Sequence, residues 1–177
     1  MMNKFRFLIG FALVTILMAA ATGCTHHFVP REYPIDEALL PPLSGDNPIK
    51  LTNMQDDTNE VLIGKNGAHK FMANLHEFTD IAIDTIKTEL QKRGIEVKEE
   101  AEKELRLSVI KVFFESRWSG VWCDVEIAVE TGDGYKGQVD GHDSNAWVLP
   151  PAVHGALNSA VVTLLNDDSI IAYLKKQ

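Results

Sequence analysis

The sequence is poor in cysteine and in basic residues. It has two cysteines, Cys24 and Cys123, so a disulfide-rich scaffold is excluded. Lys and Arg number 17 against 25 Asp and Glu, which gives a formal net charge of −8. A surface of this sign repels nucleic acid and anionic lipid headgroups, so we expect no nucleic-acid partner and no attraction of the whole chain to a membrane by charge.

Recognisable catalytic motifs are also lacking. No serine or cysteine lies in a nucleophile motif, and Gly132-Asp133-Gly134 is too short to cradle a phosphate. His76-Glu77 begins like a zinc-protease helix, but Asp80 stands where the second histidine is needed, which favours a capped, solvent-facing helix start. A further set of donors lacks the EF-hand spacing and is interpreted as a polar loop: Asp140, His142, Asp143 and Asn145. We therefore expect no catalytic residue, no cofactor and no metal, and predict that the chain is not an enzyme.

The sequence has one long hydrophobic run, at its N-terminus. Lys4 and Arg6 precede the apolar stretch 7–18, and small residues lead from it to Gly23-Cys24. The run is shorter than the ~20 apolar residues of a membrane-spanning helix, which favours a cleaved export signal over an uncleaved anchor. The layout resembles a bacterial lipoprotein signal, although Ala21 stands where that signal usually has leucine. The resemblance implies that residues 1–23 are a signal peptide and that the Cys24 thiol carries a lipid.

A lipid on Cys24 would determine where the chain resides. Each buried CH₂ group contributes ~0.8 kcal/mol, so several acyl chains hold a protein on a bilayer persistently. The next residue is Thr25, whereas Gram-negative lipoproteins retained at the inner membrane commonly have Asp there. We therefore expect the periplasmic face of the outer membrane. Cleavage would also remove Lys4 and Arg6, leaving 15 of the 17 basic residues against 25 acidic ones, or a charge of about −10.

Residues 24–47 are predicted to form a tether, and residues 48–177 a single folded domain. Prolines recur through and just after the first stretch: Pro30, Pro34, Pro41, Pro42 and Pro48. Proline disfavours helix and interrupts strand ladders. An extended chain at ~3 Å per residue would hold the domain tens of Å from the bilayer.

The first half of the domain is predicted to contain short strands and one clear helix. Strands are expected at 49–51 and 60–64, with a turn at 56–59 between them. Apolar residues then recur at helical spacing: Leu75, Phe78, Ala82, Ile86 and Leu90. Asn74 with Glu77 gives a capping-box-like start, and Gly94 is a suitable end.

The second half is predicted to be an antiparallel run of strands followed by helix. Short strand 95–97 and an exposed connection at 98–104 lead to strand 105–114, whose apolar phase changes near Val109-Ile110. That change indicates a bulge or burial on both faces. Residues 121–130 alternate cleanly and turn through Gly132–Gly134 into a strand at 135–141. Pro150-Pro151 opens a second helix, and Asp167-Asp168 caps a short last one.

This order predicts an α+β domain of two layers. A mainly antiparallel sheet would carry two amphipathic helices on one face, because both helices and one face of the sheet must bury apolar residues.

Several segments together resemble the YajG-like bacterial lipoproteins. They are the lipoprotein signal, the helix end and strand at 90–97, the strand from Leu105, the hairpin through Tyr135, and the ending from Ala156 to Asp168. The resemblance implies the α+β fold of the N-terminal domain of TolB and of auxiliary lipoproteins of lipid-trafficking ABC transporters. Beyond the acylated cysteine, it implies no functional residue.

A candidate interaction surface comprises Arg117, Trp118 and Trp122. Trp122 falls in the solvent-facing phase of its strand, and tryptophan beside arginine is typical of protein interfaces. The alternative is that these aromatics pack under a helix or the tether. Cys123 falls in the opposite phase and is interpreted as a buried, inert thiol.

Two function classes follow from these observations. The first is a non-enzymatic outer-membrane lipoprotein that acts as a structural or accessory component of the cell envelope by binding other envelope proteins. The second is an auxiliary lipoprotein of a lipid-trafficking ABC transport system, which would need an apolar cavity between helices and sheet.

Overall fold

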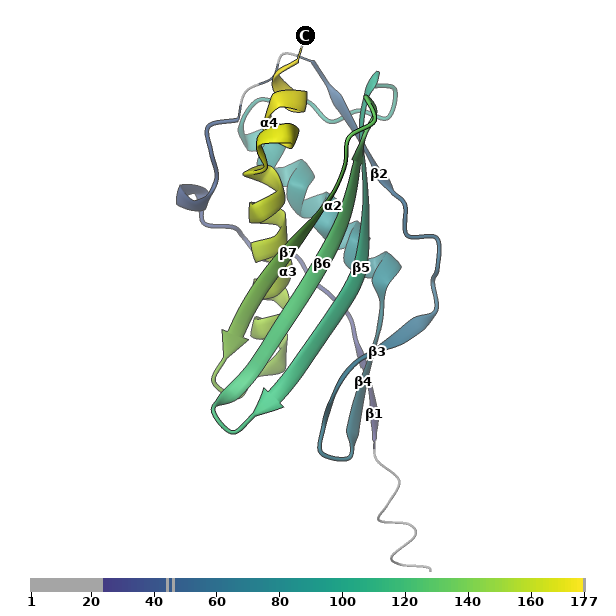
Figure 1. The fold of residues 1–177 in the computed structure, drawn as a ribbon, viewed down its shortest axis with the longest axis vertical. Coiled ribbons are helices and arrows are strands. Elements are labelled where there is room, and N and C mark those ends of the chain that lie inside the picture. Colours follow the sequence, from purple (N-terminus) through teal and green to yellow (C-terminus); the bar gives the residue numbers. More distant parts are fainter. Residues whose placement is uncertain (1–23, 44, 46, 177) are drawn as a thin grey trace, which may run out of the picture.

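A computed structural model describes residues 24–43, 45 and 47–176. These residues form a mixed seven-stranded sheet and three α-helices, and both long helices cover the same face of the sheet (Figure 1). The predicted two-layer α+β fold is confirmed. The predicted signal peptide, residues 1–23, lies outside the described residues.

The strands are β1 (Thr25–Phe28), β2 (Ile49–Asn53), β3 (Glu60–Asn66), β4 (His69–Asn74), β5 (Lys103–Arg117), β6 (Gly120–Thr131) and β7 (Lys136–Asn145). Their order is β1-β4-β3-β5-β6-β7, and β2 also pairs with β5. The pairs β3/β4, β5/β6 and β6/β7 are antiparallel, whereas β1/β4, β2/β5 and β3/β5 are parallel. Strand β5 is long enough to pair with β2 along its first half and with β3 near its end.

Strands β5, β6 and β7 form the antiparallel meander that the sequence predicts. In β6 the residues Val121, Cys123, Val125, Ile127 and Val129 are buried, and the residues between them are half-buried on the other face. The β5/β6 register shifts between Val109 and Lys111, which leaves Ile110 as the extra residue of a bulge. Of the two explanations for the phase change in β5, the bulge is therefore confirmed.

The helices are α2 (Leu75–Lys92), α3 (Leu149–Leu165) and α4 (Asp168–Lys175), with a short 3₁₀ turn η1 at Glu37–Leu39. Helix α2 begins where predicted, because the Asn74 side chain accepts a hydrogen bond from the His76 amide. Asp167 likewise caps α4. Helix α2 packs mainly on β5, and α3 packs on β6 and β7. The approach of α3 to β7 requires Gly141, since a Cβ atom there would overlap the backbone of Ala156 and Ala160.

Several local predictions differ from the structure. Strand β4 was not predicted, and it forms the hairpin with β3, while β2 and β3 each also pair with β5. Residues 95–97 contribute one isolated bridge, between Val97 and Ile49. The donors Asp140, His142, Asp143 and Asn145 belong to strand β7, so their interpretation as a polar loop was wrong.

The prediction that residues 24–47 form a free tether is also wrong, because residues 24–43 pack as part of the folded domain. Strand β1 ends at Phe28, ahead of the first proline, so no proline interrupts its pairing with β4. Residues 29–43, which we call the strap, then run across the helices without regular secondary structure apart from the η1 turn, and bury Pro30, Ile35 and Leu43. The prolines do keep the strap free of α-helix, but the segment packs here instead of hanging free.

Candidate functional site: the Cys24 end of the sheet

Cys24, the predicted lipid-bearing residue, is exposed and lies directly at the start of the sheet. Its carbonyl oxygen accepts a hydrogen bond of 3.0 Å from the Lys70 amide, which extends the β1/β4 ladder by one residue. No spacer separates Cys24 from the folded domain. A lipid on this thiol would therefore hold the sheet close to the bilayer, and not tens of Å away.

The strand registers place one end of every strand except β2 in a single row. The row runs through paired residues across the sheet: Thr25, Lys70, Lys65, Glu115, Trp122 and Ser144. Because the pairings fix the direction of each strand, three turns project beyond the row on the same side as Cys24. They are the β3/β4 turn at 67–68, the β5/β6 turn at 118–119 and the β7/α3 connection at 146–148. We call this end of the domain the Cys24 end; it is the lower end of the molecule in Figure 1.

The structure separates the three residues of the predicted interaction surface. Trp122 lies on the face of the sheet that points away from the described helices α2, α3 and α4, which we call the open face. The Arg117 guanidinium lies 5.0 Å from the Trp122 ring centroid. Trp118 lies in the β5/β6 turn and is 89% exposed. The alternative of packing under a helix or tether is thus wrong for both tryptophans.

Two further apolar residues of the Cys24 end were not predicted. Trp147 is 72% exposed and Val148 is 51% exposed, both in the connection between β7 and α3. Trp147 has a φ of 145°, a conformation that costs non-glycine residues on the order of 1–3 kcal/mol. Its amide donates to the Asn145 carbonyl at 2.9 Å, and the Val148 amide donates to the Asn145 side chain at 3.3 Å. The available sequence signal was a Trp-Val pair just ahead of Pro150-Pro151.

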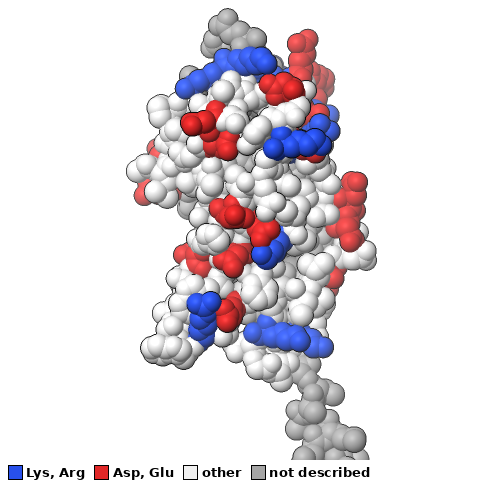
Figure 2. Space-filling view, in the orientation of Figure 1, with Lys and Arg blue, Asp and Glu red and all other residues white. Residues whose placement is uncertain are grey.

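Charge is unevenly distributed over the molecule. Near the row lie the basic residues Lys65, Lys70 and Arg117 and the acidic residues Glu115 and Asp143, although the whole chain is strongly acidic. Acidic residues gather in the middle of the open face, and basic side chains lie toward both ends of the domain, including the Cys24 end (Figure 2). Asp124, Glu126 and Asp140 form this acidic centre, in which Asp124 contacts His142 at 2.6 Å and Glu126 pairs with Lys111.

Hydrogen bonds hold the strap along one face of α3. The Arg31 amide donates to His154 Nε2 at 3.2 Å, and Asn158 and Asn166 donate to the carbonyls of Tyr33 and Leu39. His154 is 4% exposed and also stacks on the Tyr33 ring, with centroids 4.6 Å apart. Burial lowers the pKa of His154 below its usual value, and the Arg31 charge adds to the shift. Sequence reasoning missed this set because nothing local links 31–39 to a helix more than a hundred residues away.

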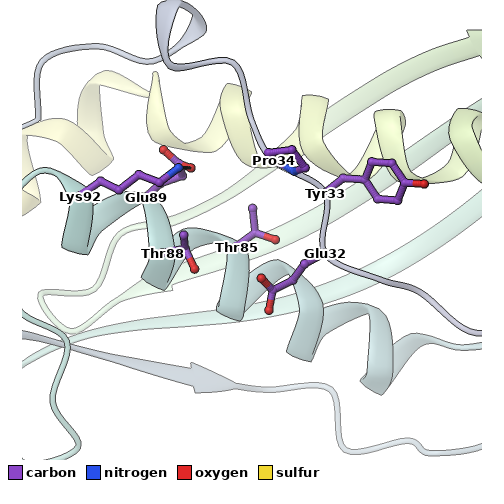
Figure 3. Close-up of a pocket in the computed structure, with 7 residues that line it drawn as sticks. All are labelled: Glu32, Tyr33, Pro34, Thr85, Thr88, Glu89 and Lys92. Atoms are coloured by element: carbon purple, nitrogen blue, oxygen red, sulfur yellow. Dashed lines mark hydrogen bonds and ion pairs between the residues drawn. The ribbon is translucent and has the colours of Figure 1, made fainter.

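A pocket of about 260 Å³ lies between the strap and α2 (Figure 3). It is lined by Glu32, Tyr33, Pro34, Thr85, Thr88, Glu89 and Lys92. Glu89 is 2% exposed and accepts hydrogen bonds from Lys92 at 2.7 Å and Arg93 at 2.8 Å. Burial acts to raise the pKa of this carboxyl, but the two cations outweigh it and the pKa is lowered. The carboxylate is thus engaged in holding the end of α2.

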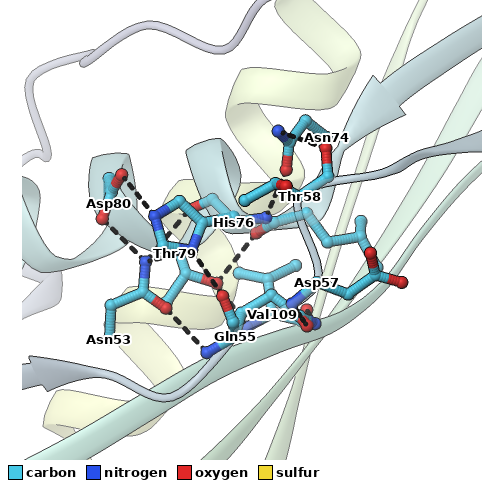
Figure 4. A network of polar contacts seen from close by, with 10 residues as sticks. Asn53, Gln55, Asp57, Thr58, Asn74, His76, Thr79, Asp80 and Val109 are labelled. Carbon is cyan, nitrogen blue, oxygen red and sulfur yellow. Dashed lines mark hydrogen bonds and ion pairs between the residues drawn. The ribbon is translucent and has the colours of Figure 1, made fainter.

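A polar network fills the gap along β5 between β2 and β3 (Figure 4). The Gln55 side chain donates to the Val109 carbonyl at 3.0 Å, and the Val109 amide donates to the Thr79 hydroxyl at 2.9 Å. His76 contacts the Gln55 carbonyl and lies 3.5 Å from Asp80. These side chains supply the partners that a neighbouring strand would otherwise give to β5. Among the described residues, no group of three or more His, Cys, Asp or Glu side chains is arranged to hold a metal ion.

Cys123 is 1% exposed, and burial raises the pKa of its thiol to about 12. Its nearest charges, Asp124 and Asp143, shift the pKa in the same direction. The thiol is therefore protonated at neutral pH and shielded from solvent, which confirms the interpretation of a buried residue.

The space between sheet and helices is filled by apolar side chains from both layers. Phe78, Leu107, Ile127 and Leu157 are each at most 1% exposed. Two more pockets, of about 520 and 310 Å³, lie at the opposite end of the sheet and beside Phe113 and Phe114. None of these three pockets lies between the sheet and the helices, where the lipid-handling hypothesis needs one. Within the described ranges, no helix is long and apolar enough to cross a membrane.

Comparisons with known proteins place no family name on the chain. A scan against protein-family models finds no match, and neither does a search of curated proteins. Among solved structures, the chain is similar to the crystal structure of protein XCC0632 from Xanthomonas campestris, described as a DUF330 protein. That similarity covers 86% of this chain and 95% of the other, with 11% sequence identity and a TM-score of 0.47. The resemblance to YajG-like lipoproteins stays a prediction.

Proposed function

We propose that this chain is a lipid-anchored, non-enzymatic lipoprotein of the bacterial outer membrane that binds another envelope protein. Cys24 carries the lipid at the periplasmic face, and the open face of the sheet is the surface for the partner. The YajG-like resemblance is part of the same proposal.

The position of Cys24 is the observation that carries this proposal. The residue that the signal pattern selects is exposed, and it is the residue at which the sheet begins. A modifying enzyme could reach the thiol, and the attached lipid would leave every described strand intact. The second cysteine, Cys123, is buried and protonated, so the two thiols differ sharply in accessibility.

The open face supports the choice of a protein partner. Arg117 over Trp122 is a pair of the kind enriched at protein interfaces. The acidic centre formed by Asp124, Glu126 and Asp140 favours a partner with basic side chains.

Mass spectrometry of the N-terminal peptide from cell envelopes tests the anchor. The expected peptide begins at Cys24 and carries the mass of a diacylglyceryl group. A Cys24→Ser chain, which cannot form the thioether, is the control. An unmodified chain that retains residues 1–23 would contradict the proposal.

Site-specific photocrosslinking tests the partner surface. A photoreactive residue at Gln138, exposed on the open face, is expected to capture a discrete protein in intact envelopes. The same residue at Lys87, exposed on the outer side of α2, serves as the matched control and is expected to capture none. Trp122→Ala should reduce the Gln138 crosslink. Equal crosslinking from both positions, or no effect of Trp122→Ala, would count against the open face.

A further inference from the structure

Two exposed tryptophans lie on the same end of the domain as the predicted lipid. Cys24 stands one residue beyond the row of paired residues, and Trp118 and Trp147 each stand three residues beyond it. At ~3.3 Å per strand residue, all three lie within about 10 Å of one another along the strand direction. These three residues come from separate segments: the start of β1, the β5/β6 turn and the β7/α3 connection. The strand registers place all three segments at the same end of the sheet.

We infer that the Cys24 end rests on the bilayer surface, with Trp118 and Trp147 inserted among the lipid headgroups. This inference rests on the proposed lipid anchor. Because Cys24 is bonded into the sheet through its carbonyl, acyl chains on its thiol hold this end of the sheet at the membrane. The turns that project furthest in that direction then meet the headgroups first.

The chemistry of the two turns fits such a surface. Tryptophan has an apolar body and a polar N–H group, and it is enriched where hydrocarbon meets water. Val148 adds apolar area beside Trp147, and the Ala146–Val148 connection holds Trp147 outward in an uncommon backbone conformation. Lys65 and Lys70 place positive charge near the same end of the domain, where anionic headgroups attract it. The acidic centre of the open face lies further from the bilayer, which reduces its repulsion.

The contact would also fix the orientation of the partner surface. The strands would stand away from the bilayer, so the open face would look along the membrane plane. Trp118 would then belong to the membrane contact, and Arg117 with Trp122 to the protein contact. The candidate surface of three residues is thus divided between two neighbours.

Single-tryptophan fluorescence tests the inference, because the sequence contains three tryptophans and all three are placed. One chain retains only Trp118 and a second retains only Trp147, with phenylalanine at the other two positions. A third chain has no native tryptophan and carries Glu99→Trp in an exposed loop at the opposite end, as the matched reporter. Each chain is bound to vesicles of phosphatidylethanolamine and phosphatidylglycerol that contain acyl-brominated lipid.

The expected result is quenching of Trp118 and Trp147 by brominated lipid and protection of both from aqueous iodide. The Glu99→Trp reporter should show the reverse. Quenching of all three would indicate nonspecific adsorption, and full access of iodide to Trp118 and Trp147 would mean that these turns face water or a protein. Either outcome overturns the inference.

Coupling a phospholipid chemically to Cys24 tests the membrane contact independently of whether cells acylate the protein. All described helices and strands lie between Thr25 and Lys175, so a chain of residues 24–177 contains the whole described core. A maleimide phospholipid should react with exposed Cys24 and spare buried Cys123. If this coupled chain shows no brominated-lipid quenching, the membrane contact fails even where mass spectrometry finds the lipid. If cells leave Cys24 unmodified, the anchor fails whatever the coupled chain does.

In the coupled chain, Trp118→Ser and Trp147→Ser should each weaken vesicle binding by about tenfold. Binding that is unchanged in the double variant would overturn the inference as well. Near-ultraviolet circular dichroism of the double variant, in which Trp122 is the remaining tryptophan, checks that the fold is retained.

Discussion

The two ends of this domain differ in the exposure of their large aromatic side chains. At the Cys24 end, Trp118 and Trp147 project from turns and are 89% and 72% exposed. At the far end, formed by α4 and the connections at 94–102 and 132–135, the aromatic Tyr173 is 6% exposed. Its hydroxyl accepts hydrogen bonds from the amides of Glu104 and Gly132 and donates to the Glu104 carbonyl. One aromatic ring is therefore buried at the far end of the domain, whereas two are exposed at the Cys24 end.

This difference separates residues that stabilise the fold from residues that are available to a neighbour. Far-end polar groups are used inside the domain: Glu89 joins Lys92 and Arg93, and Tyr173 joins α4 to the β5 and β6 ends. The exposed indoles at the Cys24 end bury little area within the domain. Exposure of that kind is common for single apolar residues, but here two tryptophans and a valine lie at the same end of the sheet as the predicted lipid.

Removing the lipid should have the largest effect on membrane binding. A Cys24→Ser chain retains the tryptophans but loses all acyl chains, so its vesicle binding should fall on the order of 10⁴-fold, compared with about tenfold for each tryptophan. Vesicle flotation of the acylated protein, the Cys24→Ser chain and the Trp118→Ser/Trp147→Ser chain measures the order. Retention of the Cys24→Ser chain on vesicles would contradict the assignment of the anchor.

Glu89→Gln should destabilise the far end by about 2 kcal/mol, because it removes a buried carboxylate that holds two cations. The folded-state pKa is lowered, so this stabilisation is present above the usual carboxyl pKa near 4.5 and is lost as the pH falls below it. Urea unfolding at pH 7 and pH 3.5 measures both effects. The matched control is Glu99→Gln in the exposed 94–102 connection, which should change stability by less than ~0.5 kcal/mol. A difference between wild type and Glu89→Gln that does not shrink at pH 3.5 would count against the ion-pair explanation.

Tyr173→Phe and Trp118→Ser compare how much a buried and an exposed aromatic side chain contribute to the stability of the domain. Loss of the Tyr173 hydroxyl leaves the Glu104 amide without this acceptor, while the Gly132 amide keeps the Glu104 carbonyl, and should cost about 1–2 kcal/mol. Trp118→Ser removes a larger side chain, yet should change the free energy of unfolding by less than ~0.5 kcal/mol, because little of that side chain is buried. Thermal unfolding of the lipid-free chains gives both values. A large loss in Trp118→Ser would show that this indole packs within the domain.

Sequence patterns predicted the parts of the fold that local chemistry determines. The alternation in β6, the caps of α2 and α4, and the phase change at Ile110 all involve neighbours within a few residues. Strand β4 was missed because its residues, HKFMAN, show no polar/apolar alternation, and only Ala73 is fully buried.

The strap and the Cys24 end could not be predicted in the same way, because both depend on contacts between distant segments. Nothing near Pro30 shows that α3 will present His154 and Asn158 to the strap. Trp118 and Trp147 come together only through the pairing of β6 with both β5 and β7. Cys24 was singled out by its local pattern, but its position at the same end of the sheet as the two tryptophans follows only from the strand order and registers.

Protonation of His154 should have the smallest effect on stability. It should make the Cys24 end of the domain more sensitive to acid than the far end. The neutral imidazole of His154 accepts a hydrogen bond from the Arg31 amide at Nε2. Burial lowers the pKa of His154 in the folded state. Stabilisation by this group is therefore present above the usual histidine pKa near 6.5 and is lost as the pH falls below it, at about 1 kcal/mol. Because the Glu89 ion pairs persist to pH 4.5, acid should loosen the strap beside the first turns of α3 before it loosens the far end.

Amide hydrogen exchange, corrected for the intrinsic pH dependence, measures that order. Protection of the Arg31 amide should fall between pH 6.5 and pH 5, while protection of the Arg93 amide, bonded to the Leu90 carbonyl, stays constant over the same range. His154→Gln keeps an acceptor that does not titrate, so the pH dependence at Arg31 should disappear in that chain. If Arg31 lost protection equally in wild type and His154→Gln, the strap would be released by some other group, and the Cys24 end would not be the acid-sensitive one.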